Sequence, residues 1–178
     1  PLTMNGTGAT SVQIADINGD GNGDIAIANT LSGTISLFEG KADGSFKDAR
    51  QFAAGTFPTA LQIQDLDGDE KLDIIFTVVT GTDRIGILRN LGNVEPGNQV
   101  EFQAVETSGV AVLPDGTTAF ALTVGQLDSN ETPDVIVTLR GDPQLDVQSV
   151  GTAINTVNIA LNSVIPGGLN IALTDTIR

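Results

Sequence analysis

Residues 60–77, ALQIQDLDGDEKLDIIFT, decide the fold of this 178-residue chain. Apolar and polar residues alternate up to Gln64, a loop rich in Asp follows, and Ile74 opens a run of β-branched and aromatic residues. A period of two is typical of a half-buried strand, and a Gly- and Asp-bearing loop between two such runs indicates a hairpin. The stretch therefore predicts two antiparallel strands joined by an acidic loop.

This pattern occurs three times along the chain. Residues 11–28, SVQIADINGDGNGDIAIA, carry a first copy, and residues 121–138, ALTVGQLDSNETPDVIVT, carry a degenerate third copy. The loops start at residues 16, 65 and 126, so the copies are offset by 49 and 61 residues. Self-similarity at such spacings is the signature of a repeat architecture. We expect a single domain, residues 1–178, with repeats at about 8–57, 58–118 and 119–178.

Further strands are expected after each loop, because apolar runs separated by turn residues continue there. They are predicted at residues 34–38, 84–89 and 156–161, with a short edge segment near 51–54 and a closing hairpin at 163–178. This gives about four strands per repeat and an all-β fold, since no segment shows convincing 3.6-residue periodicity. Residues 94–114 and 142–151 are interpreted as long loops or insertions.

The composition removes several classes of function. The chain has no Cys, His, Trp or Tyr, so thiol nucleophiles, imidazole bases and ordinary zinc sites are absent from it. Its formal net charge of −14 would repel phosphate backbones and anionic lipids, and no apolar run approaches the length of a membrane span. We expect neither nucleic-acid binding nor membrane insertion. Because residue 1 is Pro, we also expect a processed or partial product.

The loops place oxygen-bearing side chains at positions 1, 3, 5 and 9. Calcium prefers six to eight oxygen ligands, and a curled loop can present alternate side chains and the carbonyl of position 7 to one ion. The candidate ligands are Asp16, Asn18, Asp20, Asn22 through its carbonyl, and Asp24 in the first loop, and Asp65, Asp67, Asp69, Lys71 through its carbonyl, and Asp73 in the second. Two calcium sites are expected.

The third loop offers Gln126, Asp128, Asn130 and Asp134. With two carboxylates it should attract calcium least, and either a third ion or a metal-free turn is compatible with it. The predicted order of affinity is the second loop, the first and then the third, because ligand charge tunes affinity.

Plain Asn/Asp/Gly turns would use similar residues, but they do not need this spacing. An EF-hand is excluded because it needs flanking helices and a Glu at position 12.

DINGDGNGDI from Asp16 and DLDGDEKLDI from Asp65, each between two strands, resemble the FG-GAP/VCBS repeat of integrin α-type propellers and bacterial surface proteins. The resemblance implies that each repeat is a four-stranded blade whose acidic loop binds one calcium ion, and that the protein is extracellular. Three blades do not readily close a propeller. An open arc, or part of a larger propeller, is therefore expected, with other copies or the rest of a longer chain as partners.

The leading hypothesis is a non-enzymatic, calcium-binding structural or cell-adhesion module that could assemble into a filament or surface layer and bind a protein or glycan. The alternative is a carbohydrate-binding, lectin-like propeller fragment, although sugar sites generally use aromatic platforms and the chain has only seven Phe. A carboxylate-pair hydrolase is disfavoured because the clustered acids belong to the loops. Arg84, Arg89 and Arg140 are interpreted as surface charges.

Overall fold

The computed structural model describes the backbone of residues 3, 5–79, 85–95, 99–103, 117–125, 133–141, 155–165 and 168–177. Side chains are described as far as Thr138, except those of residues 117, 118 and 120. Every regular element in these ranges is a strand, which confirms the all-β prediction. The strands are β1 (Ala9–Ala15), β2 (Asp24–Asn29), β3 (Thr34–Phe38), β4 (Arg50–Ala53), β5 (Pro58–Gln64), β6 (Asp73–Val78), β7 (Ile85–Leu88), β8 (Asn90–Val94), β9 (Gln99–Phe102), β10 (Thr117–Gly125), β11 (Asp134–Gly141), β12 (Asn155–Ile165) and β13 (Gly168–Ile177).

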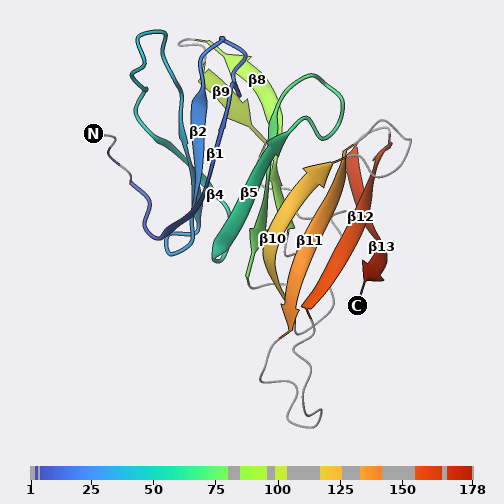
Figure 1. Ribbon diagram of the computed structural model, residues 1–178. Coiled ribbons are helices and arrows are strands. Elements are labelled where there is room, and N and C mark those ends of the chain that lie inside the picture. The colour runs from blue at the N-terminus through green and yellow to red at the C-terminus, as the bar shows by residue number, and fades with distance from the viewer. Residues whose placement is uncertain are drawn as a thin grey trace.

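Within the described residues, the strands form four small antiparallel sheets. β1 to β4 form the first sheet, β5 to β7 the second, β8 and β9 a two-stranded sheet, and β10 to β13 the last four-stranded sheet. In the three larger sheets, neighbours in the chain are neighbours in the sheet, as in an up-and-down blade. Figure 1 shows these three sheets side by side as an open array, with β5 between β1 and β10.

The predicted strand positions are largely confirmed. β3 and β7 occupy the predicted segments 34–38 and 84–89, β4 covers most of the edge segment, and β12 contains residues 156–161. β12 and β13 pair from Val157 with Ile177 to Ile165 with Gly168, so the expected closing hairpin is present. The backbone thus follows the period-two pattern wherever that pattern is clear.

The second repeat differs from the expected four-stranded blade. Its first three strands form one sheet, but β8 and β9 pair only with each other. β9 lies inside the segment 94–114 that the sequence suggested was a long loop or an insertion, so the loop alternative was wrong for residues 99–102. The segment has too few apolar residues for a clear period-two signal, although Val100 and Phe102 are buried. Residues 142–151 lie outside the described part.

Each interface between sheets is an apolar cluster built from alternate residues. The face of the second sheet that carries Leu61, Ile74 and Phe76 packs in one cluster with Ala26, Ala28, Ile35 and Leu37 of the first sheet. Its other face, with Ile75, Ile85 and Ile87, packs in a second cluster with Leu122, Val135 and Val137 of the last sheet. Because successive side chains of a strand point to opposite faces, one strand serves both interfaces.

Polar contacts tie the first sheet to the β8–β9 hairpin. Arg50 on β4 donates to the carbonyl of Val100 and pairs with Glu101 at 3.0 Å. The buried carboxylate of Glu39 pairs with Lys47 at 2.6 Å and accepts a hydrogen bond from the Val100 backbone. Arg50 also lies 3.6 Å from Glu39, so this carboxylate has two cationic neighbours as well as a backbone donor. The network therefore joins the two repeats without leaving a buried charge unpaired.

Gly86 provides a test of the apolar packing around the second sheet. It lies opposite Phe76 in the β6–β7 ladder, and a Cβ at Gly86 would collide with the Phe76 ring. We expect Gly86→Ala to lower the free energy of unfolding by about 1–3 kcal/mol, since the ring must move within a packed core. Gly125→Ala is the control, because nothing lies within 4 Å of its added Cβ, and urea denaturation measures both. Equal stability of the two variants would contradict the packing.

Candidate metal centre

The two described acidic loops lie between the first two strands of their sheets, β1–β2 and β5–β6. Three of their glycines have positive φ, namely Gly19 at 71°, Gly21 at 86° and Gly68 at 78°. These values confirm that the loops curl through the left-handed region that glycine tolerates. Glu70 takes the place of Gly21 in the second loop and also has a positive φ, 66°, which is strained for a residue with a Cβ.

The first aspartate of each loop stabilises the curl by accepting backbone hydrogen bonds. Asp65 accepts from the Gly68 N–H at 2.8 Å on one oxygen and from the Glu70 N–H at 2.9 Å on the other. Asp16 accepts in the same way from Asp20 and Gly21. In each of these two loops, two backbone N–H groups therefore donate to one carboxylate, which holds the loop in its curled conformation.

The ninth position of each loop is a buried aspartate that joins three segments of chain. Asp73, the first residue of β6, accepts from the Leu66 N–H at 3.1 Å and, on its other oxygen, from the Asn90 N–H at 2.8 Å. Asp24 accepts from Ile17 at 2.9 Å and from Gly40 at 2.8 Å. In the first two repeats the loop start, the second strand and the residue two places after the third strand are thus tied together.

The second loop brings three carboxylates together. One oxygen each of Asp65, Asp67 and Asp73 lies within 4.8 Å of the others. The Asp67 side chain is only 5 % exposed, and its Oδ2 lies against the Arg89 guanidinium as an ion pair. That oxygen is buried and has no hydrogen-bond partner in the described part of the chain. The Arg89 guanidinium thus balances the charge of Asp67 at the edge of the cluster.

The surroundings shift the pKa values of Asp73 and Asp69 in opposite directions. Burial raises the pKa of Asp73 to about 7, against the backbone hydrogen bonds from Asn90 and Leu66 that favour its charged form, and the charges of Asp67 and Asp69 add to the rise. Burial also acts on Asp69, but the hydrogen bonds from Lys71 outweigh it, and the pKa of Asp69 is lowered. A cation within the cluster would favour the ionised form of Asp73.

In the first loop, an amide replaces one of these carboxylates. Asn18 stands where the second loop has Asp67, and its Nδ2 donates to Asp20 at 3.2 Å. Asp20 also accepts from the backbone and side chain of Asn22, both at 2.8 Å. These hydrogen bonds overcome the opposing effect of burial and lower the pKa of Asp20. The first loop is therefore closed by amide donors rather than by cationic side chains.

The third loop is only partly described. Gln126, Asp128 and Asn130 lie outside the described residues. Asp134 opens β11 and is buried, as Asp24 and Asp73 are at the corresponding positions of β2 and β6. The ninth-position aspartate thus occupies a buried strand start in all three repeats.

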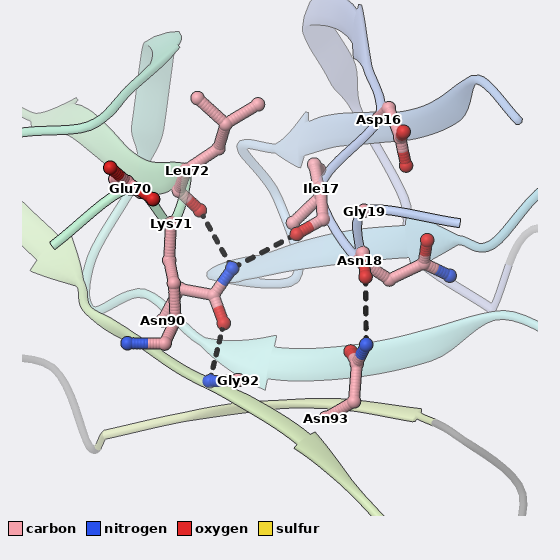
Figure 2. Close-up of a pocket in the computed structure, with 10 residues that line it drawn as sticks. All are labelled: Asp16, Ile17, Asn18, Gly19, Glu70, Lys71, Leu72, Asn90, Gly92 and Asn93. Atoms are coloured by element: carbon pink, nitrogen blue, oxygen red, sulfur yellow. Dashed lines mark hydrogen bonds between the residues drawn. The ribbon is translucent and has the colours of Figure 1, made fainter. Parts of the chain in front are cut away.

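A pocket of about 290 Å³ separates the two acidic loops, and Figure 2 shows the side chains that line it. The Asn90 side chain donates to the Ile17 carbonyl at 3.0 Å and to the Leu72 carbonyl at 3.1 Å, bridging the first loop to the second. Asn93 donates to the Asn18 carbonyl at 2.7 Å. The positions of the two loops are therefore coupled through β8.

These residues fit a hard cation. Clustered carboxylate oxygens are the donor set that such ions prefer. Sequence reasoning missed Arg89 and Asn90, which contact Asp67 and Asp73 of the second loop. Arg89 was interpreted as a surface charge, but it pairs with the nearly buried Asp67. No motif signal was available for either, because they follow β7, well beyond the loop in the sequence.

The fold and the site define a repeat protein made of small antiparallel sheets, with an acidic loop between the first two strands of the repeat. Residues 16–76, which contain both described loops, match the family model of the FG-GAP-like repeat. The match supports the family resemblance for this part of the chain. No curated protein matches the sequence.

The described part of the chain contains no helix of the length and apolarity that a membrane span requires.

The hydrogen bonds of Asp73 generate a prediction for the protein in EDTA. Asp73→Ala leaves two backbone N–H groups without their acceptor, and we expect a loss of about 1–3 kcal/mol in the free energy of unfolding. Asp69→Ala removes a partly exposed ion pair with Lys71, so its loss should stay below about 1 kcal/mol. Chemical denaturation in EDTA measures both. If Asp69→Ala costs as much as Asp73→Ala, the structural role assigned to Asp73 is wrong.

Proposed function

We propose that this protein is a calcium-binding, non-enzymatic structural or adhesion module that works outside the cell. The observation that carries the proposal is the second acidic loop, where one carboxylate oxygen each of Asp65, Asp67 and Asp73 lies within 4.8 Å of the others and the Asp67 side chain is nearly buried. Calcium is favoured because it accepts many oxygen ligands in flexible geometry, whereas magnesium demands a near-ideal octahedron. The side-chain ligands proposed for this ion are the three clustered carboxylates of Asp65, Asp67 and Asp73, together with Asp69 at position 5 of the loop.

The first loop is proposed as a second calcium site, with Asp16, Asn18, Asp20 and Asp24 as side-chain ligands. It has one carboxylate fewer than the second loop, which favours the second loop as the tighter site. Lys71 and Arg89 act in the opposite direction, since they neutralise Asp69 and Asp67. The order of affinity therefore remains a prediction. The third loop adds a site only if its first eight positions supply ligands.

The extracellular setting follows from the proposed affinity. Millimolar calcium outside cells fills sites of modest affinity, while the cytosol leaves most of them empty. An ion held at about 100 times its dissociation constant adds about 2.7 kcal/mol to stability. The non-enzymatic role is supported by the chemistry of the acids: in both described loops, the carboxylates accept backbone hydrogen bonds and are committed to holding the loop.

The carbohydrate-binding alternative gains little from the pocket between the loops. Among its lining residues there is no aromatic side chain, and the amides of Asn90 and Asn93 already donate to backbone carbonyls. Sugars generally stack on aromatic faces, so the pocket offers them only scattered polar groups. We therefore retain the structural module as the proposed function.

Thermal unfolding in EDTA and in millimolar calcium tests the proposal. We expect calcium to raise the melting temperature by about 5–10 °C for each occupied site, because about 2.7 kcal/mol per ion shifts a domain of this size by several degrees. In isothermal titration calorimetry, Asp67→Ala should remove one calcium site. Asp48→Ala, which removes an exposed carboxylate outside the loops, is the control. Absence of a calcium-dependent shift, or equal effects of the two substitutions, would sink the proposal.

Asp67→Ala should abolish calcium binding at the second loop, whereas Arg89→Gln should strengthen it. Arg89 supplies the positive charge beside the Asp67 oxygen, so an incoming calcium ion must replace it. Removing that charge should tighten calcium binding at the second loop about 3-fold or more, which corresponds to an ion pair of roughly 0.7 kcal/mol. Lys41→Gln, an exposed residue in the β3–β4 turn region, is the matched control. Weaker binding by Arg89→Gln would show that Arg89 supports the site instead of competing with the ion.

A further inference from the structure

The first sheet has an apolar face that no other described element covers fully. Val12 lies opposite Ile27 and Ile14 opposite Ile25 in the β1–β2 ladder, and residues opposite each other in an antiparallel pair share a face. Val12 is 58 % exposed and Ile14 is 71 % exposed, while Ile25 and Ile27 are partly buried. Four aliphatic side chains on adjacent strands form a contiguous patch, unlike single exposed residues. We call these four residues the leading face.

The structure shows what covers this kind of face elsewhere in the chain. With the repeat offset of 49, the leading face corresponds residue for residue to Leu61, Ile63, Ile74 and Phe76 of the second sheet. Those residues pack against the first sheet. In the last sheet, the corresponding residues are Leu122, Val124, Val135 and Val137, and they pack against the second sheet. Twice, therefore, this face docks on the opposite face of another repeat.

The last sheet presents that opposite face at the other end of the array. Ala121 lies opposite Thr138 and Thr123 opposite Ile136. Ala121 and Thr123 are exposed, and Ile136 and Thr138 are partly buried. We call these four residues the trailing face. They correspond to Ala60, Gln62, Ile75 and Thr77 of the second sheet, and Thr138 accepts a hydrogen bond from the Ala121 N–H as Thr77 does from Ala60.

We propose that the leading face of one copy docks on the trailing face of a second copy, head to tail. The occupant is another copy of this chain because the chain carries both halves of an interface that it already forms twice internally. None of the eight residues is charged, so the strong net negative charge of the protein does not place a repulsive pair at their contact. At physiological salt, charges farther than about 8 Å apart are largely screened.

This contact is heterologous, since two different patches meet. Such an interface propagates until the rotation between copies closes a ring, or it continues as an open filament. The proposal rests on the proposed function, because it gives the structural module its partner and its mode of assembly. It predicts assembly through uncharged strand faces.

Two charge-introducing variants at exposed positions separate head-to-tail docking from other kinds of association. Ile14→Lys blocks the leading face and Thr123→Lys blocks the trailing face, while each leaves the other face intact. In sedimentation velocity in millimolar calcium, we expect the parent protein to form species larger than a dimer as its concentration rises. Each variant alone should be monomeric, and an equimolar mixture should form a heterodimer and nothing larger.

Leu91→Lys is the matched control, because Leu91 is 56 % exposed and lies on β8, outside both faces. It should assemble as the parent does. A parent protein that stays monomeric throughout the series overturns the proposal, and so does self-association of Thr123→Lys alone, which would mean that two leading faces pair. Calorimetry with calcium on the same samples keeps the two ideas apart: calcium binding without assembly overturns this inference only.

Discussion

The carboxylate of Asp73 is buried at the first residue of β6 and receives one backbone N–H from the start of its loop and another from the residue that begins β8. These two bonds fix the acidic loop relative to the sheet and set where the chain leaves β7. Asp24 makes the equivalent pair of bonds in the first repeat. The curl of each loop, the convergence of its carboxylates and the position of the next hairpin all depend on this buried acceptor.

The charge balance of the loops follows from the same arrangement. Burial raises the pKa of Asp73 to about 7, and repulsion from the charges of Asp67 and Asp69 adds to the rise. Backbone amides, Lys71 and Arg89 offset part of this repulsion. A bound cation would offset the remainder, which is why a site of this kind couples ion binding to stability. Asn90 extends the coupling to the first loop through the Ile17 carbonyl.

The sheets behave as layers with two different faces. At the first interface, large residues of the second sheet such as Phe76 meet Ala26 and Ala28 together with larger aliphatic residues of the first sheet. At the second interface, aliphatic residues meet on both sides, for example Val135 and Ile75. Side chains of both faces thus fill the space between neighbouring sheets. Stacking of this kind leaves one face of each kind at the ends of the array. An open array is thus a direct consequence of having three such layers, and its ends are suited to further layers of the same kind.

The sequence by itself determined the all-β class, three repeats, the strands around each acidic loop and the candidate ligands. It could do so because period-two alternation and loop spacing are local properties of the chain. Tertiary structure alone decided that β8 and β9 leave the second sheet, that Arg89 meets Asp67, and that Asn90 bridges two loops. These contacts join residues separated by up to 73 positions, and no local pattern specifies which distant side chain will reach a given carboxylate or carbonyl.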